Sequence, residues 1–292
     1  MEIPSSTDDG EPAQSIRFRI DIFFLSALLL LAASCTQKQK ETKEEKTVPD
    51  STIIKQQQKR VADSLAKLVI QKKKIYLTFD DGPNDGTMNV LNAVKEDSIP
   101  VSFFVVGKHV FDSPQQSATW KELQADSAIE LCNHSYTHAL NHYSKYYQHP
   151  GAVVKDIERN QDSLDFDSRV VRMPGRNAWR IDLINRTDIK ESKVAIDAVH
   201  NAGFAVMGWD VEWMFDHKTL SLITDTELLL RRIENMLEAE KTKTPGHLVL
   251  LAHDQAFQTH ESVVQLHYLF QHLKNNPEYE LVLAGNYPGV KK

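Results

Sequence analysis

The sequence has little of the bias that marks unusual classes of protein. Its 292 residues include two cysteines, 11 glycines and 11 prolines. So few cysteines exclude a disulfide-stapled scaffold, and so few glycines and prolines exclude a collagen-like or low-complexity chain. An excess of basic residues is also lacking, because the 34 Lys and Arg are outnumbered by 40 Asp and Glu, which gives a net charge of −6. Without a basic excess to neutralise phosphates, we expect no nucleic-acid partner.

The remaining composition is that of a globular protein, with 41% hydrophobic and 25% charged residues. Length alone allows one or two domains, because α/β barrels of about 200–250 residues commonly form a single domain. The chain must therefore be divided by its local patterns.

Residues 1–34 have the order of an export signal. Two arginines precede an apolar run, residues 20–33, that is too short to span a bilayer comfortably. Small residues then stand directly before Cys35, an arrangement that resembles a bacterial lipoprotein box, in which the cysteine is acylated. We expect a lipoprotein signal peptide at 1–34, lipidation of Cys35 and a location at the bacterial cell envelope, periplasmic or outer-membrane associated. A signal peptide cut without lipidation and a short membrane anchor are the alternatives.

Residues 35–74 differ in composition from the remainder of the chain. From residue 36 they contain no aromatic side chain and include the charged run QKQKETKEEK. Further on, Ile54, Val61, Leu65 and Leu68 recur at intervals of seven, four and three, which predicts an amphipathic helix. We therefore expect a charged tether and helix, too short for a coiled coil. If the first cysteine carries lipid, Cys132 forms no internal disulfide and is expected to be a small buried residue.

From residue 75 onward, strand-like and helix-like segments alternate. This alternation predicts parallel βαβ units, closed into a barrel or left open as a sheet. The β-rich runs are 74–78, 101–106, 170–173, 204–209, 248–251 and 280–283. The main helical patterns between them are 87–95, 190–201, 226–240 and 262–275.

Two adjacent carboxylates, Asp80 and Asp81, follow the first predicted strand within the segment TFDDGP at 78–83. Neighbouring like charges repel each other unless a cation lies between them. One carboxylate binding a metal, with the other working beside it, resolves that repulsion. A simple turn is the alternative, because Asp, Gly and Pro are all turn formers.

Two histidines, His134 and His138, stand four residues apart in the segment HSYTH. This spacing predicts that both imidazoles lie on one side of a helical turn, a common way to bind one metal. Since His142 and His149 are also near, a merely histidine-rich region is the alternative. With an aspartate from 80–81 the pair forms an Asp-His-His set, which leaves a coordination position for water, as catalytic metal sites do.

Six segments, in this order, resemble motifs of the polysaccharide deacetylase family, which has a NodB-like domain and is carbohydrate esterase family 4. The resemblance covers residues 75–283 and implies an α/β fold, a distorted partial (β/α)7 TIM-like barrel, in one domain at 75–292. Five of them match the family's first to fifth motifs in turn: TFDDGP at 78–83, HSYTH at 134–138, RMPG at 172–175, WDVEW at 209–213 and LLAHD at 250–254. The sixth, PVSFFVVG at 100–107, resembles the family's second core strand.

The resemblance also implies a metal centre with a base beside it. Asp81, His134 and His138 would bind Zn²⁺ or another divalent transition metal. Asp80 would be the general base, held by a charge-assisted hydrogen bond from Arg172.

The remaining roles implied by the resemblance surround this centre. His253 would protonate the departing amine, and the backbone N–H of Gly175 would stabilise the oxyanion together with the metal. Trp213 and Leu251 match positions that wall the acetyl pocket.

The sequence departs from the family in two motifs. In the third motif the aromatic residue often found after the proline is Gly175, followed by Arg176. In the fourth motif Asp210 and Glu212 both precede the tryptophan, and either acid could orient His253. The choice between them stays open at the level of the sequence.

The sequence therefore predicts a metal-dependent hydrolase that removes acetyl groups from an extracytoplasmic polysaccharide. The favoured reaction is N-deacetylation of N-acetylglucosamine-type residues in peptidoglycan or a related glycan. An O-acetyl esterase acting on a xylan-like glycan and a non-catalytic carbohydrate-binding lipoprotein are the alternatives. The expected partners are the polysaccharide and a membrane reached through the N-terminal lipid anchor.

Overall fold

The computed structural model describes residues 55–60 and 72–291. The predicted signal peptide, Cys35 and most of the predicted tether lie outside the described residues, so these expectations stay predictions. Residues 55–60 are helical with exposed side chains and fall within the predicted amphipathic helix. In the described part of the chain, no helix has the length and apolar character needed to cross a membrane.

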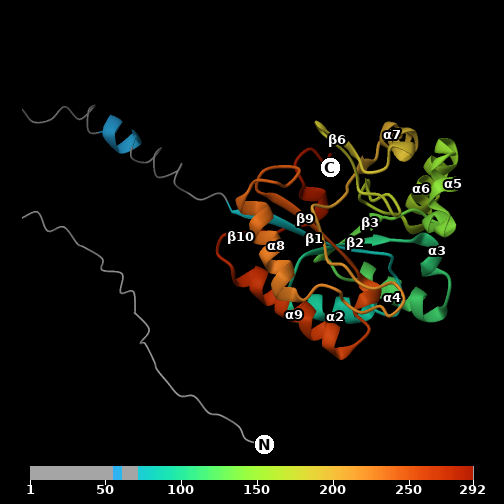
Figure 1. Ribbon diagram of the computed structural model, residues 1–292, viewed down its shortest axis with the longest axis horizontal. Coiled ribbons are helices and arrows are strands. Elements are labelled where there is room, and N and C mark those ends of the chain that lie inside the picture. Colours follow the sequence, from blue (N-terminus) through green and yellow to red (C-terminus); the bar gives the residue numbers. More distant parts are fainter. Residues whose placement is uncertain (1–54, 61–71, 292) are drawn as a thin grey trace, which may run out of the picture. The chain divides into compact units, whose positions relative to one another are not determined.

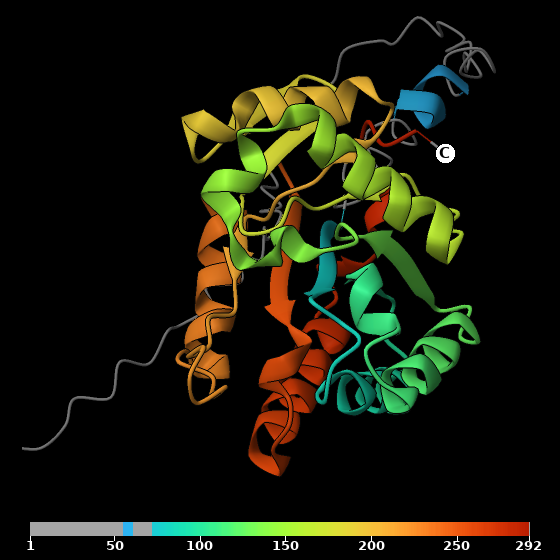
Figure 2. The ribbon, with the colours of Figure 1, turned by 90° about the vertical axis from the view of Figure 1, so that its right-hand side faces the viewer.

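One ten-stranded sheet organises the described residues from 72 to 291, and helices lie around its outside (Figures 1 and 2). Seven parallel strands follow one another in the order β7-β4-β3-β2-β1-β9-β8. The strands are β1 (Lys73–Asp80), β2 (Val101–Val105), β3 (Ile129–Asn133), β4 (Val170–Val171), β5 (Ala178–Ile181), β6 (Ile184–Thr187), β7 (Ala205–Val206), β8 (Val211–Glu212), β9 (His247–His253) and β10 (Tyr279–Leu281).

Helices and short 3₁₀ turns connect these strands. The helices are α2 (Thr87–Asp97), α3 (Gly107–Val110), α4 (Pro114–Gln124), α5 (Tyr143–Tyr147), α6 (Pro150–Leu164), α7 (Lys193–Asn201), α8 (Thr226–Glu238) and α9 (His260–Asn275). The 3₁₀ turns are η1 (His138–Asn141), η2 (Lys190–Ser192), η3 (Asp254–Ala256) and η4 (Ala284–Asn286).

The parallel run is curled into a half-barrel. Its edge strands, β7 and β8, are consecutive in the chain and are joined by residues 207–210 alone. Such a link spans at most about 18 Å, so the two edges lie near each other. Met207 N–H donates to the Val171 carbonyl and Asp210 N–H to the Val249 carbonyl, each at 2.9 Å, so the link bridges β4 and β9.

The α/β class is confirmed, but the sheet is mixed and the barrel is open. Strands β5 and β6 form an antiparallel hairpin that the sequence analysis did not predict, and β5 also pairs antiparallel with β7. Strand β10 runs parallel to the first residues of β1, on the edge that β2 occupies further along. The predicted (β/α)7 barrel is therefore only partly borne out: seven parallel strands curl into a half-barrel, but no helix lies between β7 and β8 and an antiparallel hairpin follows β4.

Alternation along β1 explains how an acid becomes buried. Ile75 and Phe79 pack outward into the core beneath the helices, whereas Tyr76 belongs to the core inside the half-barrel. Side chains two residues apart share a face of the strand, so Thr78 and Asp80 continue the inner row. They are 1% and 2% exposed. The inner row thus ends on a carboxylate at the carboxyl end of the strand.

The inner core also contains Cys132, which is fully buried and free, as expected. Burial raises the pKa of its thiol well above the ordinary value. The thiol is therefore protonated and unreactive at neutral pH.

Candidate active site

A cavity of about 720 Å³ opens at the carboxyl ends of the parallel strands. Residues from the ends of β1, β8 and β9, and from the loops after β3 and β4, line it together. Carboxyl ends of parallel strands meet at one edge of a sheet, which is why segments so far apart in sequence converge here. Of the predicted site residues it is lined by Asp80, Asp81, His134, His138, Gly175, Glu212, Leu251 and His253.

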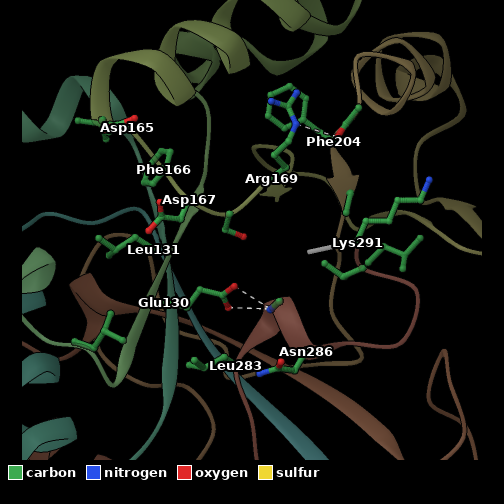
Figure 3. Close-up of a pocket in the computed structure, with 18 of the residues that line it drawn as sticks. Glu130, Leu131, Asp165, Phe166, Asp167, Arg169, Phe204, Leu283, Asn286 and Lys291 are labelled. Carbon is green, nitrogen blue, oxygen red and sulfur yellow. Dashed lines mark hydrogen bonds between the residues drawn. The ribbon is translucent and has the colours of Figure 1, made fainter.

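A larger cavity, about 1300 Å³, lies at the amino ends of β3, β4 and β7 (Figure 3). Two of the charged side chains that line it are bonded within the protein. The Glu130 carboxylate accepts hydrogen bonds from Ser102 Oγ at 2.8 Å and from Gly285 N–H at 2.9 Å. The Arg169 guanidinium donates to the carbonyls of Ala202 and Gly203. Size alone therefore does not identify the functional site.

Three potential metal ligands converge in the smaller cavity. Asp81 Oδ1 lies 3.1 Å from His138 Nε2 and 3.3 Å from His134 Nε2. Among the described residues this is the one group of three His, Cys, Asp or Glu side chains whose ligand atoms all lie within 4.8 Å of one another. Asp81 Oδ1 is buried and finds no hydrogen-bond partner in the described part of the protein. A buried carboxylate oxygen facing two imidazole nitrogens fits a divalent transition metal.

His134 is oriented for this role by its other ring nitrogen. Its Nδ1 lies 2.9 Å from the carbonyl oxygen of Arg172. A carbonyl only accepts hydrogen bonds, so Nδ1 carries the proton and the lone pair of Nε2 faces Asp81. Metal-binding histidines are commonly fixed in this way.

The expectation that the two histidines share a helical turn is wrong. His134 directly follows β3, and His138 opens η1 with a φ of 50°. Ser135 also has a left-handed φ, 64°, and its N–H is held by Asn133 Oδ1 at 2.9 Å. The Ser135 hydroxyl in turn accepts from His138 N–H at 3.0 Å. A tight left-handed loop, not an α-helix, brings both imidazoles to Asp81.

Asp81 itself sits in a left-handed turn, with a φ of 78°. His109, a residue of α3 that the sequence analysis did not select, donates from Nδ1 to the Asp81 carbonyl at 2.8 Å. Burial lowers the pKa of His109 and favours the neutral ring that makes this bond. Gln255 Nε2 contacts the second carboxylate oxygen of Asp81 at 3.4 Å.

Asp81 and His138 shift each other's pKa in opposite directions, so that each favours the charged form of the other. Burial opposes the ionised form of Asp81, but contacts with His134 and His138 and the charges of His138 and His253 outweigh burial and hold its pKa well below the usual value. Burial likewise opposes the charged form of His138, yet the close contact with the Asp81 carboxylate and its charge raise the pKa of His138. A proton thus competes with a metal for His138.

Asp80 is fixed beside the cluster by a buried ion pair. Arg172 Nη1 donates to Asp80 Oδ1 at 2.7 Å and to Thr78 Oγ1 at 2.8 Å. The guanidinium also donates to the carbonyls of Gly208 and Met207, which holds it across the mouth of the half-barrel. Asp80 Oδ2 is left 3.7 Å from His134 Nε2, too far for a hydrogen bond. The second oxygen is therefore available to a reacting group.

His253 ends β9 directly opposite Asp80, since these two residues are paired in the parallel register. Its ring packs against Phe215, with ring centroids 5.1 Å apart. His253 Nδ1 is buried without a hydrogen-bond partner among the described residues. A candidate base and a candidate acid thus stand side by side at the cavity floor.

Asp210 does not orient His253, which corrects one of the two open alternatives. Its carboxylate accepts from Lys243 N–H and Val249 N–H, each at 2.9 Å. Val249 precedes His253 by four residues, roughly 13 Å along a strand. Glu212 pairs with Leu251 and lines the cavity, but no hydrogen bond joins it to His253 in the described part of the chain.

The predicted substrate-binding residues divide between the cavity and the core. Gly175 and Leu251 line the cavity, and no protein group in the described region accepts a hydrogen bond from Gly175 N–H. Trp213 does not wall the pocket, because strand alternation turns it away from the Glu212 face. It is 1% exposed and donates to the Thr224 carbonyl at 2.8 Å. Two cavity-lining aromatics were missed, Trp209 and Tyr143.

Known proteins resemble this chain in sequence and in fold. A chitooligosaccharide deacetylase of Rhizobium leguminosarum bv. trifolii is 40% identical over 144 residues, covering 48% of this chain and 58% of the relative. A peptidoglycan-N-acetylmuramic acid deacetylase of Bacillus subtilis (strain 168) is 32% identical over 108 residues, covering 36% of this chain and 35% of the relative. The chain spans a little over half the length of the first curated relatives it matches.

A solved structure shares the fold. The family 4 carbohydrate esterase from Streptomyces lividans in complex with acetate has a TM-score of 0.53 at 19% identity, covering 74% of this chain and 95% of that one. The family model described as polysaccharide deacetylase matches residues 68–177. Because that match spans the whole Asp-His-His set and the arginine that holds Asp80, residues 68–177 belong to the polysaccharide deacetylase family, the NodB-like domain of carbohydrate esterase family 4.

Proposed function

We propose that the protein is a metal-dependent hydrolase that removes acetyl groups from an extracytoplasmic polysaccharide. One observation carries the proposal. The ligand atoms of Asp81, His134 and His138 converge on one point. Beside them lie the Asp80 carboxylate, which is held by Arg172, and the His253 imidazole, which is on the neighbouring strand β9.

The metal centre defines the reaction class. A divalent transition metal, Zn²⁺ in the first instance, supplies Lewis acidity and makes water a nucleophile near neutral pH. Three protein ligands leave room for water and for a substrate oxygen, as hydrolytic sites require. This ligand set argues against the alternative of a non-catalytic binding module, which has no need for it.

The side chains around the centre divide the proton transfers. Asp80 Oδ2 takes a proton from the attacking water, while Arg172 holds the other oxygen and keeps the carboxylate in place. The N–H of Gly175 donates to the developing oxyanion. His253 then gives a proton to the nitrogen as the carbon–nitrogen bond breaks, so acetate and a free amine leave. Each positioned acid or base contributes about 10²–10⁴ in rate.

For the substrate we propose N-acetylglucosamine-type residues of peptidoglycan or a related glycan. An amide substrate needs an acid as well as a base, because an unprotonated amine anion is a very poor leaving group. The relatives named for chitooligosaccharide and peptidoglycan deacetylation support this choice. Removal of O-acetyl groups from a xylan-like glycan uses the same attack geometry and is the competing reaction.

Acetate release tests these assignments. Zinc-loaded protein is incubated side by side with N-acetylglucosamine oligomers, peptidoglycan and acetylated xylan, and the Asp80→Asn variant serves as the control for contaminating activity. We expect zinc-dependent release from the N-acetylated glycans. Release from acetylated xylan alone would establish the esterase, and no release from any of the three would refute the proposed hydrolase.

We further propose that lipid on Cys35 anchors the protein at the cell envelope. The small residues before this cysteine and the apolar run upstream support the anchor. Fractionation of cells should find the wild-type protein with membranes and the Cys35→Ala variant released. Equal membrane retention of both would argue for a short membrane anchor instead.

A further inference from the structure

Tyr143, the first residue of α5, occupies the cavity between two parts of the candidate site. Its ring packs against the His138 ring with centroids 5.7 Å apart and planes at 87°. On another side the ring lies directly over Gly175, since a Cβ added to Gly175 would meet three of its carbon atoms at 3.1–3.2 Å. Tyr143 thus touches both a metal-ligand candidate and the residue proposed to donate to the oxyanion.

Gly175 is required for this arrangement. Its φ of +61° lies in the left-handed region, where glycine is favoured over residues with a side chain. A Cβ at this position would also crowd the Tyr143 ring, which would have to shift by a few tenths of an ångström. The absence of the aromatic residue that the third motif often carries here therefore makes room for an aromatic ring supplied by α5.

Arg176, the second departure from the third motif, is part of the same unit. It donates to the Gly175 carbonyl at 2.6 Å and to Ser192 Oγ at 2.7 Å. Its guanidinium lies 5.9 Å from the ring centroid of Tyr143 and 4.8 Å from that of Tyr147. The Tyr147 hydroxyl donates to the Pro174 carbonyl at 2.7 Å, which ties α5 to this loop. The two departures are explained together by the position of one tyrosine.

The exposure of Tyr143 completes the argument. The side chain is half-buried, not enclosed, and it lines the same cavity as the strand residues Glu212 and Leu251. An aromatic ring fixed on two sides presents its remaining surface to whatever enters. The C–H face of a pyranose ring matches an aromatic surface, whereas a water-filled cavity gains nothing from it.

We propose that Tyr143 contacts the sugar ring that carries the acetyl group and thereby sets which glycan the cavity accepts. This inference rests on the proposed function, because it assumes that the cavity binds a glycan. It assigns Tyr143, with Gly175 and Arg176 as its support, to substrate recognition.

Kinetics with two substrates test the assignment. Tyr143→Ala, Tyr143→Phe and wild type are compared on N-acetylglucosamine oligomers and on 4-nitrophenyl acetate, a small ester without a sugar. For Tyr143→Ala we expect kcat/KM for the oligomer to fall about tenfold relative to the ester, mainly through KM, which corresponds to one lost aromatic contact. Tyr143→Phe keeps the ring and should restore most of the loss. Tyr268→Ala, which changes an exposed tyrosine on α9, is the matched control and should leave the ratio unchanged.

Zinc affinity separates recognition from mere support of His138. If Tyr143→Ala weakens zinc binding and lowers kcat/KM equally for both substrates, the inference is wrong, and the ring serves only to position the metal ligand His138. An unchanged oligomer KM would equally overturn it. Binding of the oligomer to an Asp80→Asn background, measured by calorimetry, gives the affinity without turnover. A loss of that affinity with Tyr143→Ala upholds the inference even if wild type releases no acetate, which refutes the proposed function alone.

A double-mutant cycle tests the pairing with Gly175. Gly175→Ala should displace the ring and raise the oligomer KM in the wild-type background. In the Tyr143→Ala background the same change should cost less, because the ring that would have to shift is absent. Additive effects of the two substitutions would contradict the coupling.

Discussion

The two ends of the half-barrel carry cavities that differ in size and in chemistry. In the larger cavity, at the amino ends of the strands, the partly buried acid Glu130 is bonded to Ser102 and Gly285. The smaller cavity, at the carboxyl ends, contains two buried polar atoms without partners among the described residues, Asp81 Oδ1 and His253 Nδ1. Each buried unsatisfied polar atom costs about 1–3 kcal/mol of stability. The third such atom among the described residues, Asn160 Oδ1 on α6, lines neither of these two cavities. The buried atoms without hydrogen-bond partners, and not the volume of the cavity, therefore identify the carboxyl ends of the strands as the functional end of the half-barrel.

The largest expected effect separates the ligands from the base. His134→Ala removes a ligand, so zinc binding and acetate release should both be lost. Asp80→Asn keeps all three ligands, so zinc should stay bound while acetate release falls by about 10²–10⁴. Calorimetric zinc titration beside an acetate assay measures both quantities. Equal loss of zinc in the two variants would show that the assignment of His134 as a ligand and Asp80 as the base is wrong.

A smaller effect is expected at the acid. His253→Gln should lower acetate release from N-acetylglucosamine oligomers by about 10²–10³, because the amine leaves unprotonated. Hydrolysis of 4-nitrophenyl acetate should fall much less, since 4-nitrophenolate leaves without a proton. The ratio of the two rates is the measurement. A parallel loss on both substrates would mean that His253 does not act as the acid.

Asp254, at the same end of the sheet, offers a test through stability. Its carboxylate is fully buried, accepts from Thr87 Oγ1 at 2.5 Å and is also bonded by Asn84. Burial, with the charges of Asp81 and Asp80 adding to it, raises its pKa to about 7. The folded state therefore holds this proton more tightly than the unfolded state, and stability falls as pH rises from about 4 to 7.

Denaturant unfolding of metal-free protein in chelator checks this expectation, because a bound cation would alter the field of Asp81. Between pH 5 and pH 8 the wild type should lose roughly 2–3 kcal/mol more stability than Asp254→Asn. Identical pH slopes for wild type and Asp254→Asn would contradict the raised pKa.

The smallest effect on activity is expected at the opposite end. Glu130→Gln breaks hydrogen bonds in the larger cavity and should lower the free energy of unfolding by about 1–3 kcal/mol. Acetate release per bound zinc should not change. A large loss of activity with zinc still bound would mean that the two ends are coupled and that the comparison fails.

Much of the site follows from the sequence because its residues stand at strand ends. Asp80, Arg172 and His253 each end or follow a strand that the β-rich runs predicted, and parallel strands bring such ends together. Strand β3 was missed because it has five residues, two of them the polar Glu130 and Asn133.

Other parts of the site depend on contacts that no local pattern encodes. The left-handed φ values of Ser135 and His138 reverse the helical interpretation of their spacing. The hydrogen bond from His109 to the Asp81 carbonyl joins residues 28 positions apart, from α3 to the turn after β1. Asp210 and Glu212 were indistinguishable by spacing; the hydrogen bonds of Asp210 to Lys243 and Val249, and the place of Glu212 in the cavity wall, separate them.

Acetate release as a function of added zinc tests the central claim most directly. Metal-free protein is titrated with Zn²⁺ and assayed on N-acetylglucosamine oligomers at each step. The Asp81, His134 and His138 site predicts that activity rises in proportion to zinc and saturates at one equivalent per chain. Full activity in the presence of chelator, or activity that never appears with zinc bound, would contradict a metal-dependent deacetylase at the carboxyl end of the sheet.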